Sequence, residues 1–101
     1  MRRLQNRFEE AGKALEEALT IRRQLARQNP EAYSPSVAET LSELGNLRRV
    51  QKLIRKGRQA YDEALGIYEK FAELNWDRYN GDVARIKVLL KDLDEKAPIP
   101  K

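Results

Sequence analysis

The sequence contains no cysteine and no histidine, and it has only 5 glycines and 4 prolines in 101 residues. Without cysteine the chain can form neither a disulfide framework nor a thiolate metal site. Without histidine it lacks the commonest general base and the commonest transition-metal ligand. No apolar run approaches the ~20 residues that a membrane-spanning helix needs. A mechanism built on lysine, tyrosine or carboxylates stays possible, but no motif in the sequence points to one. We expect no enzyme activity, no cofactor, no metal, no small-molecule ligand and no membrane partner.

Charged residues make up 36% of the chain and hydrophobic residues 41%, with a net charge of +4 and a pI near 9.5. This balance is typical of a globular domain with a solvated surface, and the positive charge permits an acidic partner without requiring one. A chain of this length forms one domain that buries roughly two-thirds of its unfolded surface. The basic residues Arg2 and Arg3 are not followed by an apolar signal region. We expect a single cytoplasmic domain over residues 1–95.

The sequence repeats itself at an interval of 46 residues. Aligned without a gap, segments 14–47 and 60–93 carry the same residue at roughly one position in three, and most shared positions are apolar. A repeat of this length is typical of solenoid proteins, in which each unit leaves an apolar face for its neighbour. The chain therefore reads as two copies of one structural unit.

Both halves of the repeat show helical periodicity, because apolar side chains recur at intervals of three and four residues. This pattern predicts four helices, at about 7–28, 36–50, 54–74 and 82–94, and no strand. Ser36 with Glu39 three residues later has the spacing of a capping box, and Asp82 is the corresponding cap of the fourth helix. An exposed Trp76 would be an anchor for a partner, but we favour a Trp76 that folds back over the helix ends as core. The proline-rich segment 96–101 is predicted to be an extended tail.

The chain reads "RFEEAGKALEEAL" at 7–19, "NPEAYSPSVA" at 29–38 and "TLSELGNL" at 40–47. These stretches resemble helix B, the connecting loop and helix A of the tetratricopeptide repeat, in the long form found in kinesin light chains and many bacterial regulatory proteins. The resemblance covers residue 5 to about residue 93. It implies an all-α fold of antiparallel helical hairpins, a solenoid of about two repeats with four helices in the order B-A-B-A.

In that family a small residue lets helix A pack closely on helix B, and Leu41, Leu44 and Gly45 match the positions concerned. The second copy has Lys91 in place of Gly45. Losing this glycine fits a terminal helix that has no helix B after it. The helix B of the first copy, predicted at about 7–28, has no helix A before it. The resemblance thus implies an unpaired helix at each end of the array.

The turn between the second and third predicted helices has no good turn residue at the family's glycine position, which holds Lys52. We favour an ordinary turn with Lys52 in a left-handed or distorted conformation. The alternative is one continuous helix, which would open the hairpin and favour a domain-swapped dimer.

The resemblance further implies a concave groove, lined by the A helices, that binds extended peptides. The residues at the groove positions are Glu39, Ser42, Glu43, Asn46, Arg49 and Arg85. The family's pair of asparagines is absent, since the chain reads Leu41-Ser42-Glu43-Leu44 there. A solvated helix face is the alternative interpretation.

Between residues 48 and 58 the chain has basic residues and no acidic one. They are Arg48, Arg49, Lys52, Arg55, Lys56 and Arg58. Such a cluster can neutralise phosphates or an acidic protein surface. No aromatic residue is interleaved to stack on bases. A solvated turn is the favoured interpretation, and nucleic acid is the less favoured partner.

Together these features predict a non-catalytic protein–protein interaction or assembly module that associates with itself through its unpaired terminal helices. The specific hypothesis is a homodimer, with domain swapping as a variant, that buries Leu4, Phe8 and Leu15 together with Val88, Leu89 and Leu93. A Leu89→Glu substitution should dissolve it. The alternatives are an adaptor that binds a peptide in the helix-A groove and a basic accessory module that contacts nucleic acid through residues 48–58.

Overall fold

Four helices make up the computed structural model of the chain, which describes residues 4–96, with side chains over residues 6–95. They are α1 (Leu4–Gln28), α2 (Pro30–Val50), α3 (Ile54–Leu74) and α4 (Trp76–Lys96). No strand occurs within residues 4–96, and the prediction of an all-α fold is confirmed. The expected extended tail and the Leu4 side chain lie outside the described residues.

The second and fourth helices begin six residues earlier than the predicted caps Ser36 and Asp82. Asn29 caps α2, because its side-chain oxygen accepts a hydrogen bond from the backbone N–H of Ala32. Asn75, 46 residues later, accepts the equivalent bond from the N–H of Arg78. Asparagine is among the best N-cap residues, so both supposed loops are the first turns of helices.

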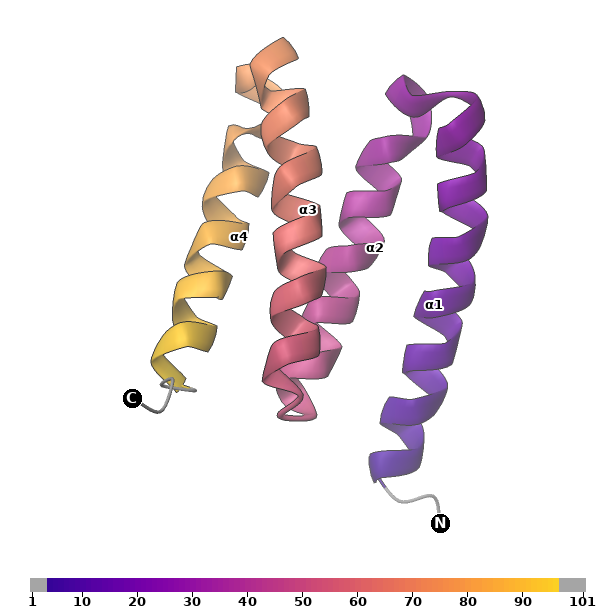
Figure 1. Ribbon diagram of the computed structural model, residues 1–101, viewed down its shortest axis with the longest axis vertical. Helices are drawn as coiled ribbons and strands as arrows, with labels where there is room; N and C mark the ends of the chain where they lie inside the picture. The colour runs from indigo at the N-terminus through magenta and orange to yellow at the C-terminus, as the bar shows by residue number, and fades with distance from the viewer. Residues whose placement is uncertain (1–3, 97–101) are drawn as a thin grey trace.

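The second hairpin turns at Lys52, which has a φ of 64° and is the only described non-glycine residue with positive φ. The chain passes from Val50 to Ile54 through this residue, and α2 and α3 run antiparallel (Figure 1). A left-handed residue ends a helix and reverses the chain. The favoured prediction of a turn at Lys52 is confirmed, and the continuous helix is wrong.

Each helix packs mainly on its neighbours in the chain. Across the flat array in Figure 1 the order is α4, α3, α2 and α1, so that α1 and α4 form opposite edges. The array measures 43 × 34 × 22 Å. Its core consists of apolar side chains from α2, α3 and α4, with Tyr61, Ile86 and Leu93 fully buried.

Helices α2 and α3 pack closely where they cross. A Cβ atom built on Gly45 would lie 2.5 Å from a ring carbon of Tyr61. On the other side of the crossing, a Cβ on Gly57 would lie 3.4 Å from the carbonyl oxygen of Gly45. The expectation that small residues bring these two helices together is confirmed at this crossing.

Candidate functional site

The edge helix α1 carries an apolar stripe that no other part of the described chain covers completely. Its alanines at 11 and 14 are exposed, Ala18 and Leu25 are half-buried, and Ile21 is 58% exposed. We call these five residues the α1 stripe. Their spacing places them on one side of the helix. The stripe is thus available to another protein surface.

The repeat shows how open this stripe is, because α3 carries the same positions 46 residues later. They are Gly57, Ala60, Ala64, Ile67 and Phe71. In α3 the first three of them are buried, with Ala60 6% and Ala64 0% exposed. Gly57 lies directly against the backbone of α2. In the second repeat, α2 covers this surface on α3. In the first repeat, the same surface is the α1 stripe, which no helix covers completely.

The other edge helix, α4, exposes the positions that α2 buries against α3. These positions are Ala84, Lys87, Val88 and Lys91, which match Ala38, Leu41, Ser42 and Gly45 of α2. All four α4 residues are exposed, and Val88 is 67% exposed. We call them the α4 face. It is more polar than its counterpart, but Ala84 and Val88 give it an apolar centre.

The residues predicted for self-association divide between surface and core. Val88 is exposed, and Phe8 and Leu15 are half-buried on α1. Leu89 packs partly against the core, and Leu93 is fully buried within the chain. Placing Leu93 in an interface needs correction, because a side chain with no exposed area can meet no partner while the fold stays intact.

The residues predicted for a peptide groove are not equally exposed. Glu39, Glu43, Asn46 and Arg85 are exposed. Ser42 is buried, and its hydroxyl donates to the carbonyl oxygen of Ala38. A peptide could therefore contact the four exposed side chains but not Ser42.

Two of the polar groups expected to hold a peptide already have partners within the chain. The Asn46 side-chain oxygen accepts a hydrogen bond from the Tyr61 hydroxyl. The Arg49 guanidinium forms an ion pair with Asp92 at 3.1 Å. A peptide would have to compete with these contacts, so the groove is less suited to peptide binding than the sequence suggests.

A polar pocket lies between the N-terminal halves of α2 and α4, with Tyr68 of α3 among its lining residues. Glu39 of α2 and Arg85 of α4 also line it. Burial raises the pKa of Tyr68, and the negative charge of Asp82 adds to the shift. The phenol therefore stays neutral at physiological pH. This pocket brings together only two of the predicted groove residues.

Half of the predicted basic cluster is engaged in ion pairs inside the molecule. Arg48 pairs with Glu16, Arg49 with Asp92, and Arg58 with Asp94. The remaining members, Lys52, Arg55 and Lys56, are exposed at the end of the molecule that holds the α2–α3 turn. The positive surface left for phosphate binding is thus about half of that which the sequence suggests.

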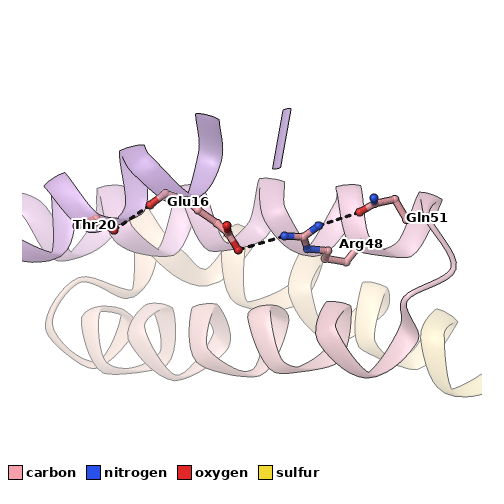
Figure 2. A network of polar contacts seen from close by, with 4 residues as sticks. All are labelled: Glu16, Thr20, Arg48 and Gln51. Atoms are coloured by element: carbon pink, nitrogen blue, oxygen red, sulfur yellow. Dashed lines mark hydrogen bonds and ion pairs between the residues drawn. The ribbon is translucent and has the colours of Figure 1, made fainter. Parts of the chain in front are cut away.

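Figure 2 shows how Arg48 joins α2 to the edge helix. Its guanidinium donates to Glu16 of α1 at 3.2 Å and to Gln51 at 3.0 Å. The site under the guanidinium is Gly12, where a Cβ atom would lie 3.2 Å from an Arg48 nitrogen. The Arg48 side chain is only 14% exposed. It is therefore a structural tie between two helices rather than a free cation.

Searches against protein-family models, curated proteins and solved structures give no match for this chain. Within residues 4–96 no helix is long and apolar enough to cross a membrane. Among the same residues, no three acidic, histidine or cysteine side chains gather as metal ligands would.

Sequence reasoning missed most of the α1 stripe, although the signal for it was present. Ala14, Ala18 and Ile21 are identical to Ala60, Ala64 and Ile67 in the second copy. Comparing the copies face by face would have shown that α3 uses these positions against α2. The apolar periodicity alone does not show it, because it cannot tell which neighbour covers which side of a helix.

Proposed function

We propose that this chain is a non-catalytic interaction module of the tetratricopeptide-repeat type, whose function is to associate with itself through its two edge helices. One observation carries the proposal. Positions that α3 buries against α2 recur on α1, where they lie open. Repeat arrays are stabilised by the interfaces between neighbouring units, and an uncovered apolar face is a binding site for another such unit.

The exposed apolar side chains on the two edges indicate the strength of the association. Ile21 is 58% and Val88 is 67% exposed. Fully burying an exposed side chain of this size contributes about 1.5–3 kcal/mol, and about three-fifths of each of these two is still exposed, so covering the rest stabilises a complex by about 1–2 kcal/mol. Removing one should therefore weaken the association by a factor of roughly 5–30. With few such residues available, we expect a concentration-dependent complex rather than a permanent one.

The test is the solution mass by light scattering over a hundredfold range of concentration. We expect the mass of the native chain to rise above the 11.7 kDa of one chain. A variant with both Ile21→Glu and Val88→Glu should stay at the mass of one chain. The matched control is Val50→Glu, because Val50 is 56% exposed at the end of α2 and lies on neither edge face. This control should associate like the native chain.

Two results would overturn the proposal. One is a native chain that keeps the mass of a monomer over the whole concentration range. The other is a double variant that retains its helicity, by circular dichroism, and still associates like the native chain. A monomeric native chain would direct attention to a different partner, and first to the pocket lined by Glu39 and Arg85. A double variant that still associates would mean that self-association uses a surface other than the two edge helices.

A further inference from the structure

We propose that the association is head-to-tail, with the α4 face of one copy lying on the α1 stripe of the next, so that assemblies grow from open ends. This inference rests on the proposed self-association and specifies its geometry. It replaces the closed homodimer expected from the sequence.

The packing of α2 on α3 is the template for this contact. The sequence of α4 repeats that of α2, and α1 repeats α3, both at an interval of 46 residues. In the template, α2 lies on Gly57, and Ala60 and Ala64 are buried. The same positions of α1 are exposed or half-buried, and the positions of α4 that match the covering face of α2 are exposed. The α4 face of one molecule thus corresponds to the covering helix face that the α1 stripe of the next molecule lacks.

Charge on the two faces agrees with this pairing. In the template, Leu41 of α2 lines a groove together with Lys56 and Glu63 of α3. At the contact between copies, Lys87 takes the place of Leu41, and Glu10 and Glu17 take those of Lys56 and Glu63. Lys13 replaces Gln59 of the same groove, so the α1 side carries two acidic groups and one basic group. A lysine therefore replaces the leucine where the facing helix has become more acidic, which favours the contact electrostatically. The Arg23–Glu63 ion pair of the template groove becomes Glu69 facing Glu17, which offsets part of this gain.

The largest increase in side-chain size on the α4 face, from glycine to lysine at position 91, is matched by a smaller side chain on α1. Gly45 of α2 leaves room for the ring of Tyr61. At the corresponding places the contact between copies has Lys91 and Leu15. Leucine has no ring, so the space that the aromatic side chain fills in the template is free for the aliphatic stem of the lysine, whose charged end reaches solvent.

The placement of the two edges excludes a closed pair with two such contacts. Helices α1 and α4 lie on opposite sides of the array in Figure 1, which is 34 Å across in this direction. A single rigid partner cannot cover both edges with its own opposite edges. A contact between different faces leaves one face free at each end, and further copies add until a ring closes or a filament forms.

The experiment uses single variants that block one face each. Ile21→Glu blocks the α1 stripe and leaves the α4 face intact, whereas Val88→Glu does the reverse. Alone, each variant should have the mass of one chain. Mixed in equal amounts, they should form a complex of twice that mass and no larger, because each copy keeps one usable face. The variant carrying both substitutions should bind neither single variant.

A charge exchange tests the same geometry without placing a charge in the apolar centre. Lys87→Glu and Glu17→Lys should each weaken association at low salt. Mixing these two variants should restore it to the native level, since every contact in an alternating assembly again joins opposite charges. High salt should reduce the difference between the single variants and the mixture.

The outcomes separate the two proposals. If the native chain is monomeric, self-association itself is wrong. If the native chain associates but Val88→Glu alone still forms dimers, the contact joins α1 to α1. Dimers of Ile21→Glu alone would mean that α4 joins α4. Either result, or the lack of any complex in both mixtures, would overturn the head-to-tail geometry while leaving self-association in place.

Discussion

A Gly45→Ala substitution should destabilise the fold, even though alanine is the better helix former. The new methyl group would lie 2.5, 2.6 and 3.0 Å from three carbons of the Tyr61 ring. Ordinary carbon–carbon contacts are about 3.5–4.0 Å long, so the ring must move by roughly 1 Å. Tyr61 has no exposed area, and no solvent space is open to it.

The expected magnitude follows from two opposing terms. Overpacking a well-packed core costs about 1–3 kcal/mol, and the fully buried ring places this site at the upper end. Replacing glycine by alanine inside a helix regains about 1 kcal/mol. The net loss is about 2 kcal/mol. For a domain of this size that lowers the melting temperature by roughly 8–16 °C.

The assay is thermal and urea unfolding, followed by circular dichroism. The matched control is Gly66→Ala, because Gly66 is an exposed α3 residue whose added methyl group meets nothing within 4 Å. It should stabilise the chain by about 0.5–1 kcal/mol. In a double-mutant cycle, Tyr61→Leu should cost less in the Gly45→Ala background than in the native one. The reasoning is refuted if Gly45→Ala is as stable as the native chain.

Two further predictions concern the turn and the buried tyrosines. Lys52→Gly should raise the free energy of unfolding by about 1 kcal/mol, because a left-handed conformation costs a side-chain-bearing residue about 1–2 kcal/mol. The control is Gln51→Gly, which should lower the free energy of unfolding because Gln51 is right-handed, with a φ of −74°. Burial raises the pKa of Tyr61 and Tyr68 above the ordinary value of 10.0. Their contribution to stability is therefore complete below pH 10 and is lost as pH rises through the raised pKa. Ultraviolet phenolate titration of the folded chain should show these two ionising only as helicity is lost, and ionisation near pH 10 in the folded state would contradict this.

Much of the fold was accessible from the sequence, because helical periodicity and the repeat both reflect the apolar core directly. Helices α1 and α3 end at Gln28 and Leu74, where the sequence pattern ends them as well. The starts of α2 and α4 were missed. Pro30 indicates a break, but a proline in the first helical position needs no N–H bond and is compatible with a helix. Asn29 supplies the cap that was assigned to Ser36.

The surface was harder to predict than the core. Trp76 was expected to be core, yet it begins α4 with 63% of its area exposed. Leu93 was expected at an interface, yet it is fully buried. Apolar character shows that a side chain prefers to be buried, but it does not specify against what. The partners of Arg49 and Arg58 lie more than thirty positions away in the sequence, and only the fold brings such charges together.

The exposure of α1 also bears on how the molecule comes apart. None of its apolar side chains within residues 6–28 is fully buried, although Leu19 and Ala26 pack against the core, and Arg48 of α2 adds polar contacts to α1 (Figure 2). Elements with little buried apolar surface detach at a lower free energy than the whole domain unfolds. A second copy seated on the α1 stripe would add buried surface to that helix. Assembly would then slow amide hydrogen exchange in α1, because the covered helix detaches less often.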